Sequence, residues 1–301
     1  MREPPSDVRD EDVLAEVRRT WDADVDRVSY LPVGFGAHHW AAYAGEVARL
    51  FVTFDERRSP ELDAAYAGAG ALRDAGGLEF VLAPLPLAEG GTTVPFGAGD
   101  LSCSTWYDGT SGEPLDVAWT TEALRRLHAV PPPPGLPLWQ PKVGPDFAMR
   151  TRLLVERDWG PGPYAAEARE AVGAGLGDVA RWTDRYHHLA GVARGRAWVP
   201  CHGEPHADNQ LLTASGRFLV DWDTLRLAPA ELDLRILVDA GVPPAEAGAD
   251  PDLLELFDVE WRLDEISQYA AWFAAPHTGT EDDVIAIADL HHELTRDEPS
   301  W

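Results

Sequence analysis

A short polar loop near the middle of the chain is the feature that most restricts its fold. This loop, residues 202–209, lies between the apolar runs 199–201 and 218–220, and Asp221 follows the second run directly. The stretch 214–216, Ala-Ser-Gly, is typical of a tight turn. The pattern therefore predicts two apolar strands joined by a hairpin-like return, with carboxylate and amide side chains where the strands end.

The oxygen-bearing side chains of this segment suit phosphoryl transfer. The carboxylate of Glu204 can orient an attacking hydroxyl group and accept its proton. Asn209 and Asp221 offer hard oxygen ligands to a Mg²⁺ ion that bridges nucleotide phosphates. We therefore predict Glu204 as the catalytic base, and Asn209 and Asp221 as metal ligands.

The same segment resembles the catalytic loop of a known family, the aminoglycoside phosphotransferases and choline kinases. Family members carry His-Gly-Asp, four variable residues and Asn, whereas residues 202–209 read His-Gly-Glu-Pro-His-Ala-Asp-Asn. Asp221 stands where the family has its metal-binding aspartate. Glu204 is one methylene longer than the family aspartate, so its carboxylate must reach the hydroxyl through a different rotamer or backbone setting.

The resemblance implies an α+β fold of the bilobal protein-kinase-like type. We expect an N-terminal nucleotide-binding lobe, residues 1–107, built from an antiparallel sheet and a helix. Residues 108–301 are expected to form a mainly helical lobe that holds the catalytic and substrate sites. Hydrophobic periodicity agrees with this division, because strand patterns precede residue 107 and helical patterns dominate after it. A glycine-rich stretch, 173–177, is expected to interrupt the helical segment 164–188.

A nucleotide site in the first lobe follows from the resemblance, with ATP or GTP as phosphate donor and Mg²⁺ as the metal. The turn Gly34-Phe35-Gly36 looks like the family's nucleotide-covering turn between the first two strands. The backbone from Ser104 to Trp106 precedes the connector between the lobes. We expect this backbone to be available to the nucleotide base.

One position departs from the kinase pattern. Kinase-like enzymes place a lysine on the third strand to bind the nucleotide phosphates, but Lys142 is the only lysine here and belongs to the other lobe. Strand alternation puts Arg49 and Thr53 on one face, with the lysine position nearest Thr53. Arg49 can replace the lysine with a guanidinium fork, held by Glu61. The alternative is that Arg49 is simply an exposed strand residue.

Substrate-binding and supporting residues are also implied by the resemblance. Residues 260–269 are similar to the C-terminal helices that line the family's substrate site, although core packing explains much of the same pattern. His202 and Asp233 are expected to support the catalytic loop, with Asp233 bracing its backbone. The candidate substrate-binding residues are Asp208, Trp261, Asp264 and Glu265.

Composition limits the partners. The net charge of −26 argues against nucleic acid or an anionic membrane and favours a cationic small-molecule substrate. Apolar residues make up 45% of the chain, no apolar run is long enough to span a membrane, and the N-terminus lacks a signal peptide's apolar centre. We expect a soluble cytoplasmic protein in which Cys103 and Cys201 are buried thiols rather than a disulfide.

The predicted function is that of a nucleotide- and Mg²⁺-dependent O-phosphotransferase, a small-molecule kinase similar to antibiotic-resistance kinases. Its expected substrate is a hydroxylated, cationic molecule such as an aminoglycoside or aminocyclitol. Two alternatives stay open. The absent lysine and altered acid fit a catalytically impaired nucleotide-binding pseudoenzyme. A metal-dependent hydrolase would instead use alternating ligands on an extended strand, together with Asp221 and Asp223; the alternating residues are His202, Glu204, His206 and Asp208.

Overall fold

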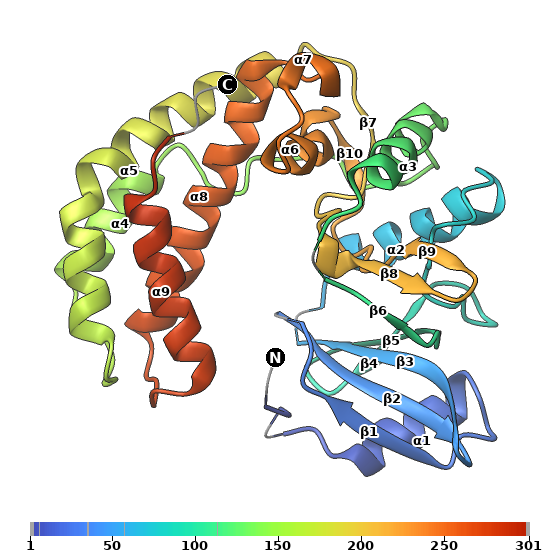
Figure 1. Cartoon of the computed structure of the whole chain (residues 1–301). Coiled ribbons are helices and arrows are strands. Elements are labelled where there is room, and N and C mark those ends of the chain that lie inside the picture. Colours follow the sequence, from blue (N-terminus) through green and yellow to red (C-terminus); the bar gives the residue numbers. More distant parts are fainter. Residues whose placement is uncertain (1–2, 6, 35, 57, 113, 299–301) are drawn as a thin grey trace. The chain divides into compact units, whose positions relative to one another are not determined.

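The structure, a computed structural model, divides the chain into two compact units (Figure 1). The described residues are 3–5, 7–34, 36–56, 58–112 and 114–298. Unit 1 comprises Met1–Leu138 and Trp198–Ala240, and unit 2 comprises Trp139–Ala197 and Gly241–Trp301. The chain thus returns to unit 1 for residues 198–240, which include the loop 202–209, and the predicted lobe boundary at residue 107 stays a prediction.

A five-stranded antiparallel sheet organises the first part of unit 1, in the order β1-β2-β3-β5-β4. The sheet is accompanied by two helices. The elements are α1 (Asp10–Thr20), β1 (Arg27–Leu31), β2 (His38–Ala44), β3 (Val47–Asp55), α2 (Pro60–Asp74), β4 (Thr93–Phe96) and β5 (Gly99–Thr105). The alternation predicted for β3 is confirmed, because Leu50, Val52 and Phe54 are buried whereas Arg49 is exposed. The buried face joins Val13 of α1 in one apolar core.

The rest of unit 1 carries the loop that was singled out in the sequence. Two small sheets are present: β6, β8 and β9 form one, and β7 pairs with β10. The elements are β6 (Gly109–Thr110), α3 (Val117–Ala129), β7 (Val199–Cys201), a 3₁₀ turn (Ala207–Asn209), β8 (Gln210–Thr213), β9 (Gly216–Leu219), β10 (Arg226–Ala228) and α6 (Glu231–Asp239). Helix α3 packs against β7 and α6, so the loop after β7 has helical support.

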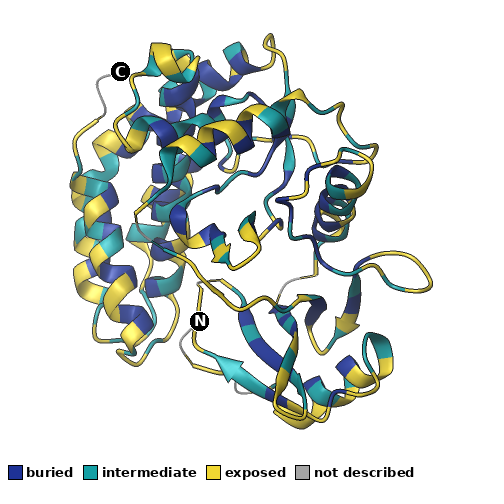
Figure 2. Ribbon diagram, turned by 45° about the vertical axis from the view of Figure 1, so that its right-hand side comes forward, coloured by how far each residue is buried: buried dark blue, intermediate teal, exposed yellow. Residues whose placement is uncertain are grey.

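Over the part of unit 2 that the structure describes, the regular elements are all helices. These are α4 (Phe147–Glu156), α5 (Ala165–Ala193), α7 (Pro244–Ala247), α8 (Pro251–Ala274) and α9 (Glu281–Thr295). The long helices α5 and α8 pack together, α4 packs on α5, and α9 packs on both α5 and α8. Each long helix has a buried side and an exposed side (Figure 2), as amphipathic packing requires.

The interruption expected at 173–177 is wrong, because α5 is continuous through this stretch. Glycine destabilises a helix interior by about 1 kcal/mol relative to alanine, and packing offsets this cost here. A Cβ atom on Gly175 would lie 2.8 Å from Leu294 of α9. The small residue therefore allows α9 to approach α5 closely.

Two predictions from composition can be compared with the structure. Cys103 and Cys201 are both buried and form no disulfide with each other in the structure. Among the described helices, none combines the length and apolarity needed to cross a lipid bilayer.

Candidate active site

The loop between β7 and β8 is anchored by a single buried carboxylate at the start of α6. The Oδ2 atom of Asp233 accepts the backbone N–H of His202 at 3.0 Å, and Oδ1 accepts that of Gly203 at 2.7 Å. The Nε2 atom of His128 lies 2.8 Å from Asp233 Oδ2. Asp233 has no solvent exposure, so these contacts fix the direction in which the loop leaves β7.

Gly203 is a loop position at which a side chain would be strained, both by the backbone conformation and by a close neighbour. Its φ angle of 100° lies in the left-handed region, which favours glycine. A Cβ atom there would lie 2.8 Å from Thr224 Oγ1, and that hydroxyl donates to the carbonyl oxygen of His202 at 2.6 Å. The glycine thus permits the close approach between the loop and the segment after β9.

Asn209 and Asp221 lie at the same end of the β8–β9 hairpin. Gln210 pairs with Leu219 in the ladder, and Val220 N–H donates to the carbonyl oxygen of Asn209 at 3.0 Å. The Asn209 side chain also donates to the backbone oxygen of Glu204 at 2.9 Å. Tertiary structure therefore brings the three predicted catalytic and metal residues into one neighbourhood within unit 1.

Asp221 has an unusual backbone. Its φ angle is 63°, and no other non-glycine residue among those described has a positive φ. Such a conformation costs free energy and persists where surrounding structure enforces it, frequently at functional sites. The strain is therefore consistent with a functional position.

Four carboxylates gather around this hairpin end. Burial, and then the charges of Glu204 and Asp55, raise the pKa of Asp221 to about 6. The pKa of Asp223 is raised by burial and by Asp221, with which it forms a hydrogen bond. Burial, and then the negative charges of Asp223 and Asp100, raise the pKa of Asp55 to about 7. Enclosure and mutual repulsion thus favour protonation in the absence of a cation.

This carboxylate group fits a divalent cation. Asp221 and Asp223 are exposed to solvent as whole residues, although their carboxyl groups are surrounded by protein atoms that raise their pKa. The Oδ2 atom of Asp55 is buried and has no hydrogen-bond partner among the described residues. Hard cations prefer oxygen ligands and offset the repulsion between them. The residues that would hold the ion are Asn209 and Asp221, with Asp223 and Asp55 close by.

Asp55 was not identified from the sequence, although a signal for it was present, and Asp223 was named there only as a ligand of the alternative metal-dependent hydrolase. Asp55 is two residues after Thr53 and therefore shares its face of β3. Asp223 is two residues after Asp221, in the stretch Asp-Trp-Asp, whose tryptophan is buried. The spacing alone does not show that β3 ends beside the hairpin, which only the fold decides.

The expected nucleotide turn lies between β1 and β2. Gly34 and Gly36 have φ angles of 73° and 94°, so both adopt the left-handed conformation that glycine allows. Phe35, the third predicted residue, lies outside the described residues. Ser104 is part of β5, where it pairs with Phe51 of β3.

One expectation about this region is wrong. Arg49 is paired with Asp22, whose Oδ2 atom lies 3.1 Å from Arg49 Nε, rather than with Glu61. The backbone N–H of Trp106 donates to the carbonyl oxygen of Arg49 at 2.9 Å, so this one donor is engaged within the protein, and the wider role of the backbone from Ser104 to Trp106 stays a prediction. In both cases a partner distant in sequence occupies the group.

The arrangement assumed for a metal-dependent hydrolase is also wrong. Strand β7 ends at Cys201 and is followed by loop and 3₁₀ structure, so the alternating residues do not share a strand face. The Nε2 atom of His202 lies 2.8 Å from Val220 O, and its Nδ1 atom accepts Glu204 N–H at 3.3 Å. Both ring nitrogens are occupied by backbone groups, which leaves neither for a metal.

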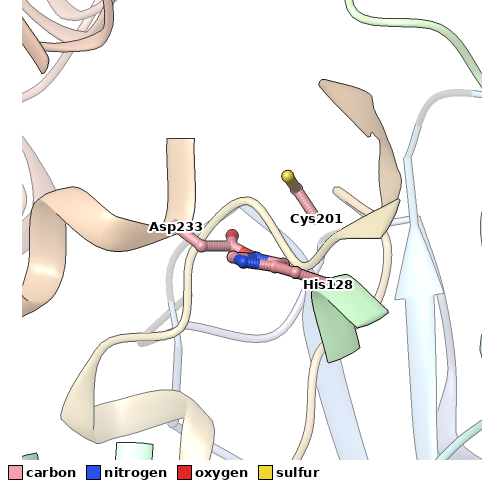
Figure 3. A group of neighbouring side chains, drawn as sticks. All are labelled: His128, Cys201 and Asp233. Atoms are coloured by element: carbon pink, nitrogen blue, oxygen red, sulfur yellow. The ribbon is translucent and has the colours of Figure 1, made fainter. Parts of the chain in front are cut away.

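One other group of potential metal ligands lies beneath the loop. Atoms of His128, Cys201 and Asp233 are within 4.8 Å of one another (Figure 3). The Cys201 thiol lies 3.6 Å from Ala228 O and 3.5 Å from Pro229 O, and burial raises its pKa. The sulfur is therefore a protonated donor to carbonyls, and the group is best described as structural support.

The candidate substrate residues lie in α8 of unit 2, apart from Asp208. The Oδ2 atom of Asp264 lies 2.7 Å from Nζ of Lys142. Burial is the main cause that raises the pKa of Glu265 to about 7. Trp261 is partly buried on the same helix, whereas Asp208 is exposed beside the loop. The pairing of Asp264 was not expected, because the only lysine is distant in sequence.

Comparisons with known proteins agree with this geometry. Residues 28–291 match the model of the phosphotransferase enzyme family denoted APH. Protein StrN of Streptomyces griseus is 29% identical over 244 residues, which cover 74% of this chain and 75% of StrN. Two solved structures are similar in fold. Spectinomycin phosphotransferase APH(9)-Ia, in complex with ADP and spectinomycin, has a TM-score of 0.72 and 16% identity over 95% of this chain and 94% of its own.

The second structure is amicoumacin kinase hAmiN in complex with AMP-PNP and Ca²⁺. It has a TM-score of 0.59 and 12% identity over 95% of this chain and 93% of its own. An antiparallel sheet, a carboxylate-bearing hairpin and a helical region define a protein-kinase-like small-molecule kinase. The chain belongs to the APH phosphotransferase enzyme family, because the family model matches most of its length. The predicted family and the predicted α+β fold are confirmed.

Proposed function

We propose that the protein transfers the terminal phosphoryl group of ATP or GTP to a hydroxyl group of a small cationic molecule, with Mg²⁺ as the metal. The leading substrate class is an aminoglycoside or aminocyclitol antibiotic. The main observation in support is the convergence of Glu204, Asn209 and Asp221 at one hairpin end, beside further carboxylates. The nucleotide and antibiotic complexes of two proteins with this fold are consistent with the proposal.

Each residue has a separate task in this proposal. Glu204 orients the acceptor hydroxyl and receives its proton as the oxygen–phosphorus bond forms and the bond to the leaving diphosphate breaks. Asn209 and Asp221 hold the metal, which neutralises phosphate charge when bound. Asp233 and His202 keep the loop in position through backbone contacts.

The choice of a cationic substrate is based on charge. The chain carries 51 acidic and 25 lysine or arginine residues, and a negative field raises the local concentration of cations. Within unit 2, Asp264 is already paired with Lys142. Asp208 is exposed next to the catalytic loop, so we propose it as the more accessible contact for a substrate amine.

A labelled phosphate-transfer screen tests the function. Aminocyclitols and aminoglycosides would be incubated with γ-labelled ATP or GTP, with and without Mg²⁺, and bound metal would be assayed in parallel. We expect labelled antibiotic that depends on both nucleotide and Mg²⁺. Nucleotide binding without transfer to any acceptor would support the pseudoenzyme instead, and metal-dependent hydrolysis without nucleotide would contradict the kinase.

A pair of glutamate variants tests the base. Glu204→Gln keeps the size of the side chain and removes its proton acceptor, so turnover should fall by about 10²- to 10⁴-fold. Glu246→Gln makes the same change at an exposed position in α7 of unit 2 and should leave turnover unchanged. Equal turnover in both variants would exclude Glu204 as the base.

A further inference from the structure

The strand position that carries a phosphate-binding lysine in kinase-like enzymes is predicted here to fall nearest Thr53. We propose that His39, on the neighbouring strand, binds the nucleotide phosphates in its place by donating a hydrogen bond from Nε2. This inference rests on the proposed nucleotide-dependent function and assigns its missing phosphate contact.

Register places His39 directly opposite the vacant lysine position. His39 of β2 pairs with Thr53 of β3, and His39 Nδ1 lies 3.3 Å from Thr53 Oγ1. When the threonine hydroxyl donates to Nδ1, the ring proton must reside on Nε2. In the proposed site the His39–Thr53 contact has this direction, in which Nε2 is a hydrogen-bond donor.

The donor end of the ring lies beside the glycine turn. A Cβ atom on Gly34 would be 3.2 Å from His39 Nε2, so the backbone of the turn approaches this nitrogen closely. Gly34 and Gly36 both have left-handed backbones, and turns of this kind commonly present backbone N–H groups to phosphates. Nε2 is therefore placed where a phosphate held under the turn would meet it.

The imidazole is held in one orientation and remains neutral. Its ring lies 4.9 Å from the Phe51 ring, centroid to centroid, at an interplanar angle of 30°. Burial, assisted by the neighbouring His38, lowers the pKa of His39 to about 4. A neutral imidazole still donates one hydrogen bond, so the contact does not require the ring to be charged.

The cationic side chain on the same face of β3 as Thr53 already has a partner. Arg49 shares the face with Thr53, but its guanidinium is paired with Asp22. Asp55, the next residue after Thr53 on that face, is a carboxylate that repels phosphate unless a metal ion lies between them. Of the side chains discussed on β2 and β3, His39 is the one that offers a donor beside the turn.

Nucleotide affinities separate a phosphate contact from a structural role. Dissociation constants for Mg-ATP, ADP and adenosine would be measured by calorimetry in the wild type and in His39→Ala. A hydrogen bond to a charged group corresponds to a loss of about tenfold to a hundredfold in affinity. We expect that loss for Mg-ATP and none for adenosine, which has no phosphate.

Further variants keep the test decisive if His39→Ala unfolds. His39→Gln retains an amide N–H and should keep part of the ATP affinity. Thr53→Val removes the hydroxyl that selects the tautomer and should weaken ATP but not adenosine. Thr53→Lys in the His39→Ala background should restore ATP binding by reinstating the lysine. His291→Ala, in α9 of unit 2, is the matched control and should leave the affinities for Mg-ATP and adenosine unchanged.

Two outcomes would overturn the inference in distinguishable ways. Equal losses for ATP and adenosine, or no loss for either, would show that His39 only packs against the turn. A wild-type protein that binds no nucleotide would instead refute the proposed function itself, and the inference with it. A melting temperature measured for each variant identifies those that have lost the fold.

Discussion

Asp221 combines a strained backbone with a raised pKa, and both properties lead to tests at the scale of the residue. Its left-handed φ of 63° disfavours most side chains, but asparagine tolerates this conformation better than alanine does. Asparagine also removes the charge that a metal requires. The substitution Asp221→Asn therefore separates the chemical role of the residue from its backbone.

We predict that Asp221→Asn lowers phosphate transfer by about a hundredfold or more, since even groups that only orient metal ligands contribute up to about this factor. The free energy of unfolding of the metal-free protein should not fall, because asparagine fits the same φ and removes a charge that the neighbouring carboxylates repel. Asp221→Ala should lose activity and also stability. Transfer assays and denaturant unfolding check both parts, and an active Asn variant would remove Asp221 from the site.

The pKa of Asp221 also predicts how the metal-free protein responds to pH. Its folded pKa of about 6 exceeds the unfolded value of about 3.9, so the folded state holds the proton more tightly. This contribution to stability is present below about pH 4 and is lost as pH rises through about 6. A bound cation competes with this proton. With metal present, the folded state therefore favours the ionised form of Asp221.

Addition of Mg²⁺ or Mn²⁺ should therefore raise the melting temperature more at pH 7.5 than at pH 5. The reason is that a metal must displace a proton at the lower pH and finds free carboxylates at the higher one. Thermal unfolding with and without metal at both pH values measures the effect. A metal-induced shift of the same size at both values would contradict the proton competition.

At the scale of the element, one carboxylate and one long helix illustrate how packing overrides local preference. Asp233 lies in the first turn of α6 and fixes the loop after β7 by accepting two backbone N–H groups. Helix α5 runs through the three closely spaced glycines of 173–177, which would favour its interruption in isolation. Contacts with α4, α8 and α9 stabilise the continuous form.

We predict that Gly177→Ala stabilises the protein by about 0.5–1 kcal/mol. A Cβ atom there would meet no atom within 4 Å, and alanine loses less backbone entropy than glycine in a helix. Gly175→Ala is the matched comparison, since its Cβ would lie 2.8 Å from Leu294. The free energy of unfolding, measured with denaturant, should be larger for Gly177→Ala than for Gly175→Ala. The opposite order would contradict this explanation.

For the whole molecule, the net charge of −26 affects both stability and substrate capture. Like charges repel in the compact state, and the same field attracts cations. Salt screens both effects, because the Debye length falls from about 30 Å at 0.01 M to about 10 Å at 0.1 M. The charge therefore predicts opposite salt responses for folding and for substrate capture.

Addition of salt from about 10 mM to about 300 mM should raise the melting temperature and lower kcat/KM for a multiply charged aminocyclitol. The value of kcat at saturating substrate should change much less, because it does not depend on the rate at which enzyme and substrate associate. Steady-state kinetics over a salt series measures this, with a neutral acceptor as the control. A kcat/KM for the cationic substrate that is independent of salt would argue against steering.

The sequence alone determined the features that repeat locally or lie close together along the chain. Alternation identified the faces of β3, and the loop 202–209 with Asp221 identified the hairpin and its family. These signals are local, since strand periodicity and turn chemistry depend on near neighbours.

Only the tertiary structure decided which distant groups meet. It pairs Arg49 with Asp22, supplies the Trp106 N–H with a backbone acceptor and keeps α5 continuous. It also brings Asp55 near Asp223 and sets His39 opposite Thr53. The physical reason is that hydrogen bonding and electrostatics act through space, so their partners follow from the packing of elements and not from spacing along the chain.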